Sequence, residues 1–277
     1  MSIPTPINPY EAPESEGYGA ETRLVVPESF LGKLAMGFRL LFGNLVIIAP
    51  LVLVIWLPAN FAIETLVARS ATPDDPMAAL PLDNIVEVFF GPLISGAVIS
   101  LLAERFQGRK PRVIEVVRSG LQSWGPLFLT RLVVGIILML GLIALVVPGI
   151  VLAVRYAMVD EVVVLEGAGV TVARRRSSDL SRGRGRLIFF SGLIYLTVLL
   201  LIGTGIAFAQ ELLPGTNTLG MRVGAQSLLN VLSHVITCVM FLYYWEAYAK
   251  DQSFREAEAF GNVDDLTWLS KRNANDS

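Results

Sequence analysis

Arg155 has the position that most suggests a chemical role. It lies in an apolar run about two helical turns after Pro148-Gly149, roughly 9 Å inside one end of a predicted membrane helix. A charge at such a depth is costly and usually faces a partner or a polar cavity. Two interpretations stay open: a contact to a ligand or ion, or a structural ion pair or an arginine that extends to the membrane surface. Candidate partners at similar depth are Glu87, Glu64 and Glu211.

A polar stripe runs along the last predicted membrane helix. Its residues are Ser227, Asn230, His234 and Thr237, and their steps of three, four and three place them on one helix face. Such a stripe faces either other helices or a water-filled path, and a histidine there is able to relay protons near neutral pH. The alternative interpretation is hydrogen bonding between helices, without a transport role.

The usual catalytic motifs are absent from the sequence. With one histidine and one cysteine, the chain holds no Cys/His metal site and no HExxH motif. It also lacks the phosphate-binding GxxxxGK[ST] loop and the GxSxG nucleophile elbow. Asp160 and Glu161 are adjacent and therefore point in different directions on a helix, so they make no paired acid/base site. The sequence predicts a non-enzymatic protein with no cofactor, no metal and no nucleic-acid partner.

Composition indicates that these residues lie in a membrane. The chain has 277 residues, of which 53% are hydrophobic and 17% charged, and its mean hydropathy is +0.60. Several apolar runs approach the roughly 20 residues that cross a bilayer. The predicted fold is an all-α polytopic helix bundle with about six transmembrane helices. The predicted spans are about 45–67, 85–103, 127–147, 150–165, 187–209 and 224–247.

Three further segments have apolar residues at helical spacing but are short. Residues 29–42, 112–123 and 170–181 are predicted as amphipathic helices that lie along the membrane surface. The membrane domain as a whole is predicted to extend over 29–249. It is flanked by a disordered tail at 1–28, rich in Pro, Glu and Ser, and a polar tail at 250–277.

Positive residues gather on one side of the predicted spans. The two loops after the second and fourth spans contain most of them: Arg105, Arg109, Lys110, Arg112 and Arg118, then Arg174, Arg175, Arg176, Arg182, Arg184 and Arg186. The opposite loops hold Arg69 and Arg222. This asymmetry predicts an inner bacterial membrane protein with both termini in the cytoplasm. The arginines at 174–186 are further predicted to contact anionic lipids, or alternatively to fix topology alone.

The stretch from Pro148 to Arg186 resembles a known pattern. It reads PGIVLAVRYAMVDEVVVLEGAGVTVARRRSSDLSRGRGR. A Pro-Gly turn, an intramembrane arginine, a "vvvLEG" exit and an "AxxRSxxLxxG" basic helix also occur in the membrane domain that precedes the catalytic barrel of some bacterial glycerophosphodiester phosphodiesterases. The polar tail is far shorter than the roughly 250 residues of that barrel. The resemblance therefore implies a stand-alone membrane module without the phosphodiesterase activity.

Two functions follow from these features. The first is a non-enzymatic membrane protein that organises lipids or membrane protein partners, indicated by the basic surface segments and the missing catalytic motifs. The alternative is a transporter or channel for an ion or small molecule, with a path near Arg155 and the polar face of the last span. Flux into proteoliposomes distinguishes the two.

Overall fold

Helices make up the regular structure of the protein. The computed structural model describes residues 26–69, 80–212 and 218–259, and these residues contain no strand. The predicted tails lie largely outside them. The all-α prediction is confirmed. In chain order the helices are α1 (Phe30–Gly43), α2 (Leu45–Ala68), α3 (Leu80–Phe106), α4 (Val113–Ala144), α5 (Val146–Arg155), α6 (Val159–Glu166), α7 (Val170–Leu180), α8 (Gly185–Leu212), α9 (Leu219–Ser233) and α10 (Val235–Ala259).

Five helical stretches of the described residues are long and apolar enough to cross a membrane. They are Leu45–Ala68, Leu82–Phe106, Val113–Ala144, Gly185–Gln210 and Leu219–Gln252. Each overlaps one of the predicted spans, and together they make the chain a multi-pass membrane protein. Leu219–Gln252 combines α9 and α10, which are separated by a break at His234.

The predicted fourth span, 150–165, is wrong, because no single helix covers it. Helix α5 has 10 residues and ends at Arg155, and α6 has 8 residues and begins at Val159. The Ser177 hydroxyl of α7 explains the break. It donates to the carbonyl oxygen of Arg155 at 2.9 Å and accepts the N–H of Met158 at 3.2 Å. Backbone groups freed by the interruption are thereby satisfied.

The predicted surface segments differ in outcome. Segments 29–42 and 170–181 are separate helices, α1 and α7, as expected. Segment 112–123 is instead the first part of α4, continuous with the apolar stretch that follows. Lys33 of α1 is buried, with 1% of its surface exposed. Its Nζ forms an ion pair with Glu246 Oε2 at 2.9 Å, which ties α1 to α10.

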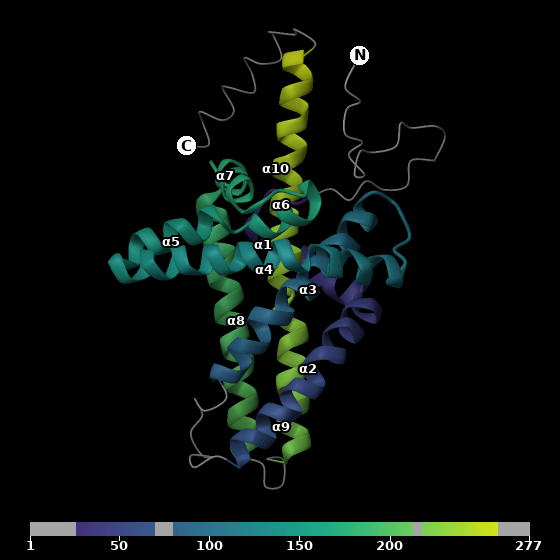
Figure 1. Ribbon diagram of the computed structural model, residues 1–277, viewed down its shortest axis with the longest axis vertical. Helices are drawn as coiled ribbons and strands as arrows, with labels where there is room; N and C mark the ends of the chain where they lie inside the picture. The colour runs from purple at the N-terminus through teal and green to yellow at the C-terminus, as the bar shows by residue number, and fades with distance from the viewer. Residues whose placement is uncertain (1–25, 70–79, 213–217, 260–277) are drawn as a thin grey trace.

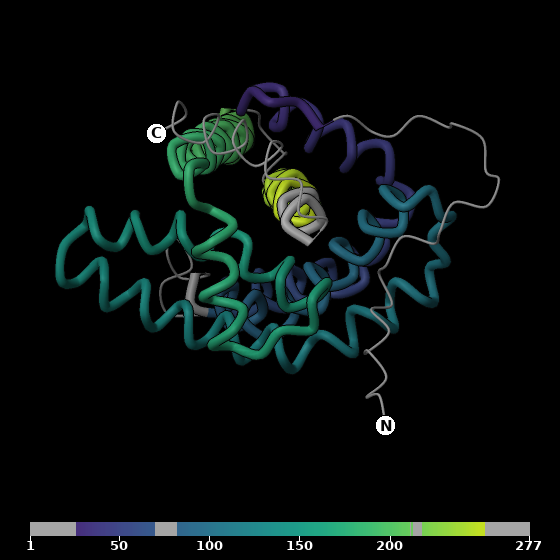
Figure 2. Tube along the Cα trace, turned by 90° about the horizontal axis from the view of Figure 1, so that it is seen from above, coloured from purple at the N-terminus to yellow at the C-terminus, as the bar shows by residue number. Residues whose placement is uncertain are grey.

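The helices adopt two directions in space. In Figure 1, α8 and the α9–α10 pair run along the long axis, with α2 inclined beside them. Helices α4 and α5 form an antiparallel pair that lies across this axis, and Figure 2 shows the pair side-on while α8 and α10 are seen end-on. One end of the molecule is near this pair, and it contains the end of α3, helix α7 and the start of α8. We call it the basic end, because exposed residues there include Arg109, Arg112, Arg182 and Arg186.

Candidate functional site

A polar cavity of about 370 Å³ lies among the apolar helices. It draws residues from α2, α3, α4, α8, α9 and α10. Four residues selected from the sequence, Glu87, Asn230, His234 and Thr237, line it together. The other lining residues are Trp56, Asp83, Asn84, Ser95, Arg131, Tyr195, Gln226, Ser233 and Ile236. Polar side chains at this density among membrane helices are expensive and mark a binding site or a water-filled path.

Arg131 of α4 supplies the positive charge of the cavity. Its Nη2 and Nε lie 2.5 and 3.0 Å from Asp160 Oδ2, and Nη2 also donates to Ser95 Oγ at 2.7 Å. Glu87 is more distant, with Oε1 3.6 Å from Nη1. Sequence reasoning missed Arg131, although it lies in an apolar run inside the predicted third span. That position is the same signal that selected Arg155.

Two carboxylates lie on the α3 wall. Asp83 and Glu87 are one helical turn apart and both line the cavity. The Glu87 side chain remains 55% exposed, so its carboxylate is accessible from the cavity. Gly91 leaves room for it, because a Cβ at position 91 would collide with Glu87 Oε1 and lie 3.0 Å from Arg131 Nη1. The lining of the cavity thus contains two acidic side chains and one arginine.

The polar stripe has two roles in the structure. Its first part joins α9 to α2: Asn60 Nδ2 donates to Ser227 Oγ at 3.0 Å, and Asn230 Nδ2 donates to Asn60 Oδ1 at 3.5 Å. Its second part lies at the helix break, where His234 Nδ1 is 2.9 Å from the carbonyl oxygen of Asn230. A carbonyl only accepts, so Nδ1 donates a proton here, and in the neutral ring Nε2 is an acceptor. Sequence reasoning did not select Asn60.

Aromatic side chains complete the lining. The Tyr195 hydroxyl donates to the Ser233 carbonyl oxygen at 2.9 Å. Trp56 is 4% exposed, and its indole N–H has no hydrogen-bond partner among the described residues. A buried donor without a partner costs free energy, commonly about 1–3 kcal/mol, unless a ligand or water accepts from it.

Arg155 is not part of this cavity. Its side chain is exposed at the basic end, where its backbone carbonyl is held by Ser177. The expected partners contact other arginines. Glu87 faces Arg131, and Glu64 Oε2 accepts from Arg222 Nε at 2.8 Å. The expectation that Glu87 or Glu64 pairs with Arg155 is therefore wrong. The side chain of Glu211 lies outside the described part of the structure.

The arginines at 174–186 divide into internal and exposed groups. Arg176 bridges Glu166 and Asp251, with N–O distances of 3.2 and 2.7 Å, and Arg184 Nε lies 3.9 Å from Glu246 Oε1. Arg174 is partly buried. The exposed members are Arg175, Arg182 and Arg186. A surface role for this segment therefore rests on the exposed group.

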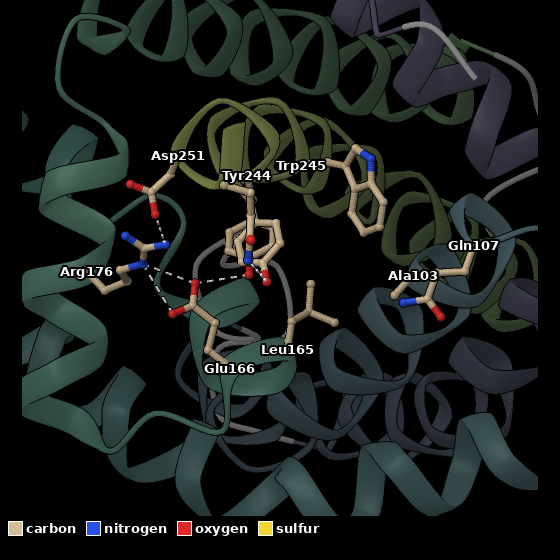
Figure 3. A pocket seen from close by; sticks show the side chains of 10 residues that line it. Ala103, Gln107, Leu165, Glu166, Arg176, Tyr244, Trp245 and Asp251 are labelled. Atoms are coloured by element: carbon tan, nitrogen blue, oxygen red, sulfur yellow. Dashed lines mark hydrogen bonds and ion pairs between the residues drawn. The ribbon is translucent and has the colours of Figure 1, made fainter. Parts of the chain in front are cut away.

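A second cavity, of about 400 Å³, lies beside Arg176 (Figure 3). Tyr244 of α10 donates to Glu166 Oε1 at 3.1 Å, and Trp245 of the same helix also lines the cavity. Burial alone would lower the pKa of the Arg176 guanidinium, but the carboxylates of Asp251 and Glu166 raise it above its usual value. This charge network joins α6, α7 and α10.

Glu161 is a buried acid next to the network of Arg131. It lies on α6, outside the five stretches that could cross a membrane, and is 1% exposed. Burial, and then the charge of Asp160, raise the pKa of its carboxyl well above the usual value. Its Oε2 has no hydrogen-bond partner within the described residues. The protonated form is therefore favoured in the folded protein.

Known proteins similar to this chain are membrane proteins. Residues 113–250 match a family model described as "Domain of unknown function (DUF7847)". The chain is 23% identical to the UPF0259 membrane proteins of Yersinia pestis (strain Pestoides F) and Yersinia pseudotuberculosis serotype O:3 (strain YPIII), over 68% of this chain and 72% of each relative. No solved structure matches it. The names of these relatives state no activity, and the likeness to the phosphodiesterase membrane domain stays a prediction from residues 148–186.

Proposed function

We propose that the protein is a membrane carrier for small amine-bearing solutes, which bind in the polar cavity. One observation carries the proposal: a cavity among membrane helices combines two accessible carboxylates, Asp83 and Glu87, with the aromatic residues Trp56 and Tyr195. A carboxylate forms charge-assisted hydrogen bonds with an ammonium group. Aromatic rings add attraction for the same cation. This is the transport alternative from the sequence, with Arg131 in the place expected for Arg155.

The remaining polar groups favour a solute with an acceptor as well as an amine. The indole N–H of Trp56 has no acceptor among the described residues, and a hydroxyl or carbonyl oxygen of a solute would satisfy it. Arg131 is held most closely by Asp160 and Ser95, and its contact to Glu87 is longer, at 3.6 Å. In the proposal it supports the cavity wall, while Asp83 and Glu87 face the cation.

The break between α9 and α10 favours a carrier that transports its solute over a protein that only binds it. Carrier sites are often built from discontinuous membrane helices, whose interrupted backbone lines the site. His234 is the residue at the break, and its side chain faces both the cavity and the Asn230 carbonyl group. A bend here would change the spacing between α9 and α3 and alter access to the cavity.

Uptake into proteoliposomes tests the proposal. The probes are radiolabelled ethanolamine and putrescine, with glycerol as the uncharged probe. We expect uptake of at least one amine above protein-free vesicles and no uptake of glycerol. Glu87→Gln and Asp83→Asn should each lower the rate about tenfold or more, whereas Glu115→Gln, an exposed acid outside the cavity, should leave it unchanged. Absence of uptake for both amines, with no thermal shift on adding either, would refute the carrier.

Organisation of anionic lipids is the second candidate function. Exposed arginines at the basic end favour it: Arg155, Arg175, Arg182 and Arg186. Clusters of basic residues near a membrane attract anionic headgroups at about 1 kcal/mol for each residue. Copurification of phosphatidylglycerol in excess over its share of the host membrane tests this role, and copurification in proportion to abundance would refute it.

A further inference from the structure

Residues 132–154 form an apolar hairpin that projects from the rest of the bundle (Figures 1 and 2). They comprise the end of α4, Leu145 and most of α5, and contain only apolar residues, glycines and Pro148. Large side chains on both arms are exposed, among them Ile143 at 75% and Val147 at 71%. A helical element that is apolar all round belongs in the hydrocarbon and not at a water interface.

The two arms of the apolar hairpin pack closely at its turn. Gly141 and Gly149 let the arms touch, since a Cβ at Gly141 would lie 3.3 Å from Gly149 Cα. The Leu145 N–H donates to the Gly141 carbonyl oxygen at 3.0 Å, and the Gly149 N–H donates to the Leu145 carbonyl oxygen at 3.3 Å. Pro148, in the first turn of α5, has no N–H to satisfy. These bonds, and the proline without an N–H, reduce the number of backbone groups that the turn would expose to hydrocarbon.

The apolar hairpin is too short to cross a bilayer twice. Helix α5 has 10 residues, or about 15 Å at helical rise, against a hydrocarbon thickness of about 30 Å. The two arms also lie across the direction of α8 and α10 in both views. An element of this length and direction enters and leaves through the same leaflet.

Arginines surround the base of the apolar hairpin. Arg155 ends its second arm, and the Arg155 carbonyl oxygen accepts from Ser177 and, at 3.5 Å, from Ser181. The start of α8 is adjacent, because a Cβ at Gly185 would lie 3.4 Å from Val154 Cγ1. Exposed side chains near this point are Arg155, Arg182 and Arg186. Arg182 is 81% exposed and has Asp179 at 3.5 Å, and the described residues give Arg155 and Arg186 no ion pair.

We infer that the apolar hairpin lies in the plane of the membrane within one leaflet, and that Arg155, Arg182 and Arg186 at its base bind the anionic headgroups of that leaflet. The inference rests on the second candidate function and names its site. The occupant is an anionic lipid surface, since an apolar arm in hydrocarbon and a cationic base match the two parts of one lipid layer. The positive charge places this leaflet on the cytoplasmic side.

Labelling of the hairpin tip tests its depth. Val147→Cys is made in a Cys238→Ser background, with Thr218→Cys and Arg109→Cys as references for the two ends of the molecule. An impermeant maleimide should label the Thr218→Cys protein from outside intact cells and leave the Val147→Cys protein unlabelled. A spin label at position 147 should collide with oxygen and not with a water-soluble nickel chelate. Labelling of position 147 from outside would show a full crossing and overturn the in-plane hairpin.

Lipid affinity tests the arginines at the base of the apolar hairpin. Phosphatidylglycerol is titrated into the purified protein and followed by native mass spectrometry, with phosphatidylcholine as the neutral lipid. The triple variant Arg155→Gln/Arg182→Gln/Arg186→Gln should lose at least tenfold in affinity for phosphatidylglycerol. The matched control Arg109→Gln/Lys110→Gln/Arg112→Gln removes the same charge from an exposed loop of the basic end and should lose less than twofold.

The results of the lipid titration distinguish the proposed lipid site from the general role in lipid organisation. Equal loss in the two triple variants would overturn Arg155, Arg182 and Arg186 as a specific site, while the general role in lipid organisation would stand. No preference of the parent protein for phosphatidylglycerol would overturn both the site and the second candidate function. The depth of the hairpin tip is measured without added lipid, so it tests the in-plane arrangement in either case.

Discussion

Arg131 on α4 directs two nitrogens at one oxygen of Asp160 on α6, Nη2 at 2.5 Å and Nε at 3.0 Å. The contact joins the wall of the polar cavity to the segment that follows the break after α5. Ser95, on α3, accepts from the same Nη2. Three helices therefore meet at one guanidinium, and its main counter-ion is Asp160, whose side chain is 21% exposed.

Loss of Arg131 is expected to destabilise the protein strongly. Arg131→Leu leaves Asp160 without its counter-ion, and breaking a buried pair from one side costs about 3–5 kcal/mol in the free energy of unfolding. Thermal unfolding can be followed with a thiol-reactive dye, because Cys238 is buried and reacts on unfolding. The double variant Arg131→Leu/Asp160→Asn should recover most of the loss. Arg109→Leu, an exposed control, should unfold like the parent, and equal unfolding of Arg131→Leu would contradict the pair.

The sequence predicts the helical class and the polar face, but it does not identify the paired arginine. Apolar runs and the spacing of Asn230, His234 and Thr237 are local signals, and the structure places all three at one cavity. Choosing between Arg131 and Arg155 requires knowing which helices meet. Both lie in apolar runs, and only the position of Asp160 across from α4 decides the choice.

The spacing of apolar residues did not predict the break between α5 and α6 either. Residues 150–165 read as one apolar span, and the hydroxyl that ends α5 comes from Ser177, on a later helix. Arg155 then marks the end of a short helix at the basic end instead of a charge inside a span. A tertiary contact here overrides the local apolar pattern. The sequence of residues 150–165 alone does not contain that contact.

Ser177 is expected to fix the α5–α6 break. Ser177→Ala removes a donor to the Arg155 carbonyl and an acceptor for the Met158 N–H, both in a buried setting. Leaving two such groups unpaired should lower the free energy of unfolding by about 1–3 kcal/mol. Ser178→Ala, one residue along the same helix, is the control and should change stability by less than about 0.5 kcal/mol. Matching thermal unfolding of the two variants would argue against this role for Ser177.

Gly91 is expected to matter for binding more than for folding. A Cβ at position 91 pushes the Glu87 carboxylate away from its place beside Arg131, and the flexible end of Glu87 moves with little strain. Gly91→Ala should therefore unfold within about 1 kcal/mol of the parent, since alanine also favours the helix. Its affinity for the transported amine should fall about tenfold, or about 1.4 kcal/mol. Gly125→Ala in α4 meets no atom within 4 Å and should keep the parent affinity. Unchanged binding in Gly91→Ala would remove Glu87 from the site.

Glu161 is expected to make stability fall as pH rises. Its pKa in the folded protein is raised well above the usual value, chiefly by burial. Below the usual glutamic acid pKa both folded and unfolded chains hold the proton, so the group has no effect there. As pH rises above that value the unfolded chain releases its proton while the folded chain keeps it, and unfolding is favoured by at most about 1.4 kcal/mol for each pH unit.

Glu161→Gln separates this contribution from the other titrating groups. The amide holds no titrating proton, so the variant should gain stability over the parent as pH is raised from 5 to 8, and the gain should be smallest at pH 5. The difference in melting temperature between variant and parent, measured at each pH with the Cys238 dye, reports the effect. Glu115→Gln, whose side chain is 53% exposed, should show no such trend. A difference that stays constant with pH would mean that Glu161 does not hold its proton in the folded protein.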